Sequence, residues 1–158
     1  MIDRETGSLV LRAGRVDPSV TRSEFRASLM AAGAQWDDMH TGWMHAQLPV
    51  EVDGDRKVGV RLLFDGERFD GYRLWLVDAR YGTSWDDWSE EKQLAQRDAH
   101  DAWLVEMLGP GLRRQTPGGM ELSYSLPWGD VWSAYDPRSA GSSIGVRFRP
   151  AGSSRPAL

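Results

Sequence analysis

Three histidines are the side chains best suited to metal binding or proton transfer near neutral pH. His40 and His45 stand five residues apart and follow the acidic pair Asp37 and Asp38. Two ligands usually share a side through an i,i+4 spacing on a helix or an i,i+2 spacing on a strand, and this spacing fits neither. We therefore expect surface or structural histidines here, and no metal site.

The other catalytic residue types also lack the spacing that their chemistry requires. Cysteine is absent, which excludes disulfides, thiolate zinc sites and cysteine nucleophiles. The sequence has no G-x-S-x-G elbow, no Walker motif and no G-x-G-x-x-G loop. His100 and Asp101 are adjacent in a predicted helix, where neighbouring side chains diverge by about 100°. We predict a chain without an enzymatic site and without a cofactor.

Acidic residues occur in adjacent pairs, but adjacency does not give the convergent geometry and the pKa difference of a general acid–base pair. Asp86 and Asp87 precede a predicted helix, whose dipole favours negative charge at that end. The other acidic residues could face a basic protein, although a solvated acidic surface explains each of them equally well. These candidates for partner contact are Asp37, Asp38, Asp53 and Asp55.

Tryptophan is unusually frequent, with eight in 158 residues. We expect most of them in the core, because tryptophan buries a large apolar area. Trp85 and Trp88 are at i,i+3 and are predicted to fix the long helix onto the sheet. A cleft lined by aromatic rings is the alternative, and its candidate residues are Trp75, Trp128 and Trp132.

Length and charge narrow the class of protein. A chain of 158 residues fits one domain. Its net charge is −4 and its 19 basic residues are scattered, so we expect no nucleic-acid partner. No apolar run is long enough to cross a membrane, and the start MIDRETG lacks the pattern of a signal peptide. We expect a soluble cytoplasmic protein.

The first half of the chain predicts a helix followed by an antiparallel meander. Thr21 and Glu24 form a capping box that opens a helix ending near Gly33. Residues 34–42 are predicted to be a polar connection. In the strands predicted at residues 57–64 and 72–81, apolar residues recur at every second position over residues 58–64 and 72–76. The residues between them include Arg61 and Arg73, which we therefore expect on the face opposite the apolar side chains. The predicted strands are residues 8–12, 43–52 with a break at Pro49, 57–64 and 72–81.

The second half predicts a long helix and a group of strands. The helix spans residues 89–108 and is expected to bury Leu94, Ala95, Ala99 and Trp103 on the sheet. Residues 111–119 are predicted to be a flexible connection before strands at 120–126, 131–135 and 143–148. The fold class is therefore α+β: one domain over residues 1–149, with a mainly antiparallel sheet of about six strands packed by two helices. Residues 150–158 are predicted to be a flexible tail.

Three stretches carry a resemblance that covers about half of the chain. They are residues 7–28 (GSLVLRAGRVDPSVTRSEFRAS), 83–109 (TSWDDWSEEKQLAQRDAHDAWLVEMLG) and 124–148 (YSLPWGDVWSAYDPRSAGSSIGVRF). They resemble a group of small bacterial cytoplasmic proteins, whose members are similar to the immunity proteins encoded beside contact-dependent or polymorphic toxins. The resemblance implies a small α+β protein with a protein partner, and it assigns no binding residue.

Two functions follow as expectations. The first is non-catalytic protein binding, which would neutralise a toxin domain, such as a basic one, by covering its active site. The second is binding of a small ligand in the aromatic cleft, which a deep apolar pocket would support. An enzyme without a recognisable motif would instead need convergent titratable groups in a cleft.

Overall fold

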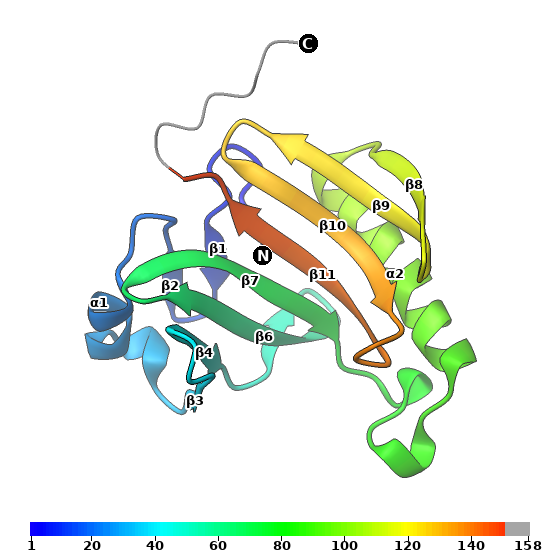
Figure 1. Ribbon diagram of the computed structural model, residues 1–158, viewed down its shortest axis with the longest axis horizontal. Coiled ribbons are helices and arrows are strands. Elements are labelled where there is room, and N and C mark those ends of the chain that lie inside the picture. Colours follow the sequence, from blue (N-terminus) through cyan, green and yellow to red (C-terminus); the bar gives the residue numbers. More distant parts are fainter. Residues whose placement is uncertain (151–158) are drawn as a thin grey trace.

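The computed structural model describes residues 1–150. Figure 1 shows a broad twisted sheet, with the short first helix beside one end and the long second helix behind the other. The helices are α1 (Arg22–Ala27) and α2 (Glu90–Leu108), with short 3-10 helices η1 (Leu29–Ala31), η2 (Ala79–Tyr81) and η3 (Trp85–Asp87). The strands are β1 (Leu9–Leu11), β2 (Gly14–Val16), β3 (Gln35–Asp38), β4 (Trp43–Gln47), β5 (Glu51–Asp53), β6 (Arg56–Asp65), β7 (Arg68–Leu76), β8 (Leu112–Thr116), β9 (Gly119–Leu126), β10 (Gly129–Asp136) and β11 (Gly141–Phe148).

The main sheet has nine strands in the order β3-β4-β6-β7-β11-β10-β9-β8, with β5 also paired to β6. Each of these pairings is antiparallel. The mainly antiparallel sheet and the two helices agree with the sequence prediction, but the count of about six strands was wrong.

The missing strands are largely the edges of the sheet. β3 and β8 were predicted to be connections, because their sequences QWDD and LRRQT do not alternate apolar and polar residues. Most of their side chains are exposed, so burial does not impose that alternation. The third additional strand comes from the segment predicted as one strand at residues 43–52. The chain is interrupted at Pro49, as expected, and forms β4 and β5 as separate strands. Of the predicted tail at residues 150–158, only Pro150 lies among the described residues.

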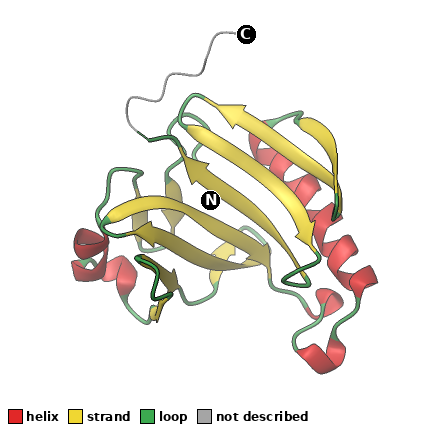
Figure 2. Cartoon of the chain, viewed as in Figure 1, coloured by secondary structure: helices red, strands yellow, loops and turns green. Residues whose placement is uncertain are grey.

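The core lies on one side of the main sheet. Figure 2 shows α2 passing behind the strands of the second half of the sheet. Phe25 of α1 packs against Phe64 of β6 and Trp36 of β3, with ring centroids 6.0 and 6.2 Å away. The β1–β2 hairpin adds Leu9 and Val16 to the same core cluster. Both helices and the hairpin therefore cover one face and leave the other free.

The first helix begins where the capping box predicts. Thr21 accepts a hydrogen bond from the backbone N–H of Glu24 at 3.2 Å, and the Glu24 carboxylate accepts one from the Thr21 N–H at 2.8 Å. The α-helix ends at Ala27, and the separate turn η1 replaces the expected continuation to Gly33.

The long helix α2 has the predicted bounds but buries a more polar face than expected. Trp103 is buried, whereas Leu94 and Ala99 are half-buried and Ala95 is exposed. The buried positions also include four polar side chains, which the apolar pattern does not reveal: Gln93, Gln96, His100 and Asp101.

The two glutamines and His100 bind backbone groups at the end of β7, in η2 and near the start of β11. Gln96 donates from Nε2 to the carbonyl of Leu76 at 2.7 Å, and His100 Nε2 accepts from the N–H of Leu76 at 3.0 Å. Gln93 donates to the carbonyl of Tyr81 and accepts from the N–H of Ser142. A buried backbone group without a partner costs free energy, so these contacts fix α2 across the sheet.

Burial lowers the pKa of His100 to about 3, so its ring is neutral at physiological pH. The ring is fully buried, and Nε2 accepts a hydrogen bond, which places the ring proton on Nδ1. Nδ1 has no hydrogen-bond partner among residues 1–150.

Replacing the buried indole tests the packing of α2. Trp103 is 1% exposed and donates from Nε1 to Asp53 at 3.2 Å. We expect Trp103→Ala to lower the free energy of unfolding by about 3–5 kcal/mol in denaturant titrations. Trp85→Ala is the control, because Trp85 is 77% exposed and its loss should cost below about 1 kcal/mol. Equal losses in the two variants would contradict this packing.

The buried histidine predicts a loss of stability in mild acid. Its folded pKa is about 3 and its ordinary value is 6.5, so below pH 6.5 the unfolded chain binds a proton that the folded chain excludes. The contribution is complete above pH 6.5 and decreases by about 1.4 kcal/mol per pH unit below it, or about 2 kcal/mol by pH 5.

Denaturant titrations at pH 7 and pH 5 measure this loss. His100→Gln should reduce the pH dependence by that amount. An unaltered pH dependence in His100→Gln would show that the ring titrates normally.

Candidate functional site

The face of the main sheet opposite the two helices is the candidate site, and we call it the open face. Strand register aligns its side chains in rows across the sheet. The central row, from β3 to β8, is Gln35, Gln47, Arg61, Arg73, Gly145, Trp132, Ser123 and Leu112. A parallel row is Asp37, His45, Leu63, Gly71, Arg147, Asp130 and Ser125.

Two arginines face each other at the centre of the open face. Arg61 of β6 and Arg73 of β7 are direct cross-strand partners. Like charges in that position destabilise a sheet. Gln47 accepts a hydrogen bond from Arg61 Nε at 3.2 Å, which orients this guanidinium without neutralising it. Neither arginine has an ion pair within residues 1–150. Asp136, which lines the same surface, offsets part of the charge of Arg73, and the positive charge that remains suits a surface that receives negative charge.

Each of these arginines lies over a tryptophan ring. The Arg61 guanidinium is 5.9 Å from the ring centroid of Trp75, and that of Arg73 is 4.6 Å from the ring of Trp132. The contacts are cation–π interactions, which order both partners. They hold long side chains against the sheet, so a binding partner would meet a surface that is already arranged.

Glycines beneath the rings make this arrangement possible. Gly59 is the cross-strand partner of Trp75, and a Cβ atom on it would lie 2.1 Å from the indole. Gly145 is the partner of Trp132, and a Cβ atom there would lie 2.4 Å from that indole and 2.0 Å from Arg73. Only glycine lets the side chains lie this close to the backbone.

The arginines and tryptophans line a shallow depression of about 520 Å³. Its boundary toward the β10–β11 turn is polar. The lining residues are Arg61, Arg73, Trp75, Trp132, Ala134, Asp136, Ser139 and Ser143. The depression presents flat rings and hydrogen-bond donors to solvent, which suits a complementary surface or an anionic group.

The titratable groups beside the depression favour net positive charge. Burial lowers the pKa of His45, and the positive charge of Arg61 lowers it further, so the ring is predominantly neutral at pH 7. Burial also lowers the pKa of Arg73, but the pKa of a guanidinium is ordinarily so far above neutral pH that this group stays charged. The depression therefore contains two guanidinium groups and one acidic side chain, Asp136, and the predominantly neutral ring of His45 lies beside it.

Two of the three tryptophans proposed for an aromatic cleft come together here. Trp75 and Trp132 line the same depression. Trp128 lies elsewhere: its Nε1 donates to the carbonyl of Arg4 at 2.9 Å, and its ring is 6.1 Å from that of Phe148. It packs over Gly7 and attaches the N-terminal segment to the sheet, so the three rings do not line one cleft.

The four acidic candidates fall into two separate places. Asp37 lies at the edge of the open face, and Asp38 is its neighbour on β3. Asp53 and Asp55 lie near the opposite end of β6, since Asp53 pairs with Arg56 while Asp38 aligns through Met44 with Phe64. Eight residues of strand separate these levels, roughly 26 Å. One compact partner contact would not include all four.

The aromatic pair before α2 corrects another expectation. Trp85 and Trp88 were predicted to fix α2 onto the sheet, but Trp85 is 77% exposed and Trp88 38%. Trp88 instead donates from Nε1 to the carbonyl of Ala140 in the β10–β11 turn at 2.7 Å. The spacing i,i+3 predicts a shared helical side only inside a helix, and these residues belong to the short turn η3 that precedes it.

The residues considered for metal binding or proton transfer lie apart in the described part of the chain. No group of three or more His, Asp or Glu side chains in residues 1–150 is arranged to hold a metal ion. The three histidines lie apart: His40 is in the β3–β4 turn beside Asp38, His45 is on the open face and His100 is in the core.

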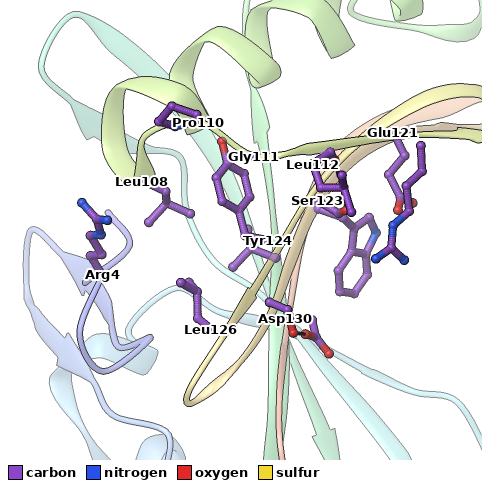
Figure 3. A pocket seen from close by; sticks show the side chains of 14 residues that line it. Arg4, Leu108, Pro110, Gly111, Leu112, Glu121, Ser123, Tyr124, Leu126 and Asp130 are labelled. Carbon is purple, nitrogen blue, oxygen red and sulfur yellow. Dashed lines mark hydrogen bonds between the residues drawn. The ribbon is translucent and has the colours of Figure 1, made fainter. Parts of the chain in front are cut away.

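A second hollow, of about 660 Å³, lies beside the β8–β9 edge of the sheet and the end of α2. Figure 3 shows Leu108, Tyr124 and Leu126 around it, with Arg4 at its margin. The Tyr124 hydroxyl donates to the carbonyl of Gly109 at 2.8 Å, which closes the end of α2. These three residues belong to the core cluster or pack against it, and the charged residues Arg114, Glu121 and Asp130 also line the hollow.

The sequence contained part of the signal for the open face. Alternation placed Arg61 and Arg73 opposite the apolar residues, but it could not show that register makes them direct partners. His45 was considered only as a metal ligand. Its neighbours on β6 and β7 depend on pairings between strands that lie far apart in the sequence.

Comparisons with known proteins give one likeness in fold. No family model matches the chain, and no curated protein matches it. The structure is similar to a chain of the solved structure titled "Rhs1-CT in complex with cognate immunity protein RhsI1". The TM-score is 0.51 at 13% sequence identity, over 94% of this chain and 86% of that chain. In residues 1–150, no helix is long and apolar enough to span a membrane.

Adding a methyl group beneath Trp75 tests the close packing of the open face. Gly59→Ala should displace the indole and lower the free energy of unfolding by about 1–3 kcal/mol in denaturant titrations. Gly141→Ala is the control in the same sheet, because its Cβ atom would meet nothing closer than 3.8 Å. If both variants have the stability of the wild type, Trp75 does not lie on the backbone as described.

Proposed function

We propose that the chain is a non-catalytic, protein-binding immunity protein that neutralises a cognate bacterial toxin domain. The observation that carries the proposal is the open face. Two neighbouring arginines without an ion pair in residues 1–150 lie there over tryptophan rings, and no helix or hairpin covers them. Tryptophan and arginine are enriched among the residues that dominate the energy of protein interfaces. The cytoplasmic location expected from the sequence is part of this proposal.

The likeness in fold supports the same class of function. The similar chain comes from a complex of Rhs1-CT with an immunity protein, and it matches nearly the whole of this chain. Of the two roles in such a complex, the immunity role suits this protein better. The described residues offer a broad binding face but no cluster of groups arranged for turnover.

The open face favours a partner with negative charge at the centre of the contact. Arg61 and Arg73 would bind carboxylates of the toxin domain, and each such bond is charge-assisted. Asp37 and Asp38 lie beside the open face and are proposed to contact the periphery of the partner. Asp53 and Asp55 remain candidates for a separate contact.

A small anionic ligand is the second candidate, because Trp75 and Trp132 line a depression of about 520 Å³ with the two arginines. Flat rings and guanidinium groups suit a planar ligand that carries a carboxylate or a phosphate. A thermal shift that saturates with such a ligand, and that is lost in Arg73→Ala, would favour this alternative.

The test is co-expression with the C-terminal domain encoded by the neighbouring gene. We expect a one-to-one complex and protection of the cell from that domain. The double variant Arg73→Ala/Trp132→Ala should weaken binding by about 2 kcal/mol or more, roughly 30-fold in Kd, by calorimetry.

Arg12→Ala is the matched control, since this exposed arginine belongs to the β1–β2 hairpin on the other side of the molecule. Its Kd should equal that of the wild type. Equal affinities in the double variant and the control would remove the open face from the proposal. Absence of any complex would remove the function.

A further inference from the structure

An exposed aromatic segment lies beside the open face, and we call residues 82–89 the tip. Figure 1 shows this segment, between β7 and α2, extending beyond the end of the sheet. Trp85 is 77% exposed, the largest value for a tryptophan among the described residues, and Trp88 is 38% exposed. An exposed indole of this size is a typical centre of a protein contact.

The tip is held in place although it is exposed. Trp88 donates to the carbonyl of Ala140 at 2.7 Å, which attaches the tip to the β10–β11 turn. The ring of Trp85 is 6.4 Å from that of Trp88. Lys92 of α2 bonds both the carboxylate and the carbonyl of Asp87. Because the tip is already ordered, presenting Trp85 to a partner costs little conformational entropy.

The charge around Trp85 is negative. Asp86, Glu90 and Glu91 are exposed, and their carboxylates have no ion pair or side-chain hydrogen bond within residues 1–150. Beside them, a groove of about 330 Å³ runs between the two indoles and the β10–β11 turn. An indole surrounded by free carboxylates matches an apolar site bordered by Lys or Arg.

The tip and the open face form one continuous surface. Ser139 in the β10–β11 turn lines both the groove at the tip and the depression at the centre of the open face. The surface therefore changes sign from Asp86 and the acidic start of α2 to the Arg61–Arg73 pair, although the depression with the arginines also contains Asp136. Two neighbouring patches of opposite charge restrict a partner to one orientation.

We propose that the tip is a docking surface for a basic, apolar-centred site on the protein that covers the open face, with Trp85 as its central contact. The inference rests on the proposed function, since it concerns the same toxin domain. It adds a second contact of opposite charge. The partner then presents negative charge to Arg61 and Arg73, and positive charge to Asp86 and Glu90.

The experiment measures binding of the purified C-terminal domain encoded by the neighbouring gene. Trp85→Ser should raise Kd at least about tenfold, because it removes the central indole. Leu29→Ser is the matched control, since Leu29 is 88% exposed in η1 and its loss should leave Kd unchanged. Melting temperatures within a degree or two of the wild type should show that both variants are folded.

Charge is tested separately by association rates. Asp86→Asn should slow association about two- to fivefold at low salt, and the difference should vanish at high salt because screening removes it. Glu5→Gln, an exposed charge in the N-terminal segment, should have no effect.

The outcomes separate this inference from the proposed function. If Arg73→Ala/Trp132→Ala weakens the complex while Trp85→Ser binds within twofold of the wild type, the tip is not a docking surface and the proposed function stands. If no complex forms with the wild-type protein, the proposed function and the tip fail together. Weaker binding by both Arg73→Ala/Trp132→Ala and Trp85→Ser, with unchanged affinity in the two control variants, would support one continuous binding surface.

Discussion

The hydrogen bonds between α2 and the last residue of β7 determine much of this structure. Gln96 and His100 occupy one side of the helix and bind the carbonyl and the N–H of Leu76, so the strand can stop beneath a helix without leaving buried groups unpaired. The chain is then free to leave the sheet, form the tip and return as α2. Because α2 supplies hydrogen-bond partners to the end of β7 from the core side of the sheet, no other segment has to cross the opposite face to supply them.

The sequence predicted the elements with strong local signals and missed those that depend on distant pairing. The capping box at Thr21, the bounds of α2 and the break at Pro49 all correspond to interactions within a few residues. The strand β3 has no local pattern, because its exposed position at the sheet edge allows any polar residue. The buried face of α2 was misjudged for a related reason, since Gln96 is buried by a bond to another element.

In the candidate site, too, the sequence predicted what depends on local patterns and missed what depends on pairing between distant strands. Alternation was sufficient to place Trp75 and Arg73 on one side of a strand. It could not bring Trp132 to Arg73, because that contact crosses β11 and depends on Gly145 between them. Surface features were hardest to predict: Trp85 resembles a core residue by type, and only the fold shows it standing in solvent.

The two edges of the sheet have a consequence for the behaviour of the protein at high concentration. β3 ends in Asp37 and Asp38, and β8 carries Arg114 and Arg113, the second of which pairs with Asp101. Free strand edges invite pairing with another chain, which leads to fibres and aggregates. When two copies meet through the same edge, however, each brings a row of charge of the same sign, and the strands repel before their backbones can bond. Charge at the edges thus opposes symmetric self-assembly, while the open face can remain uncovered.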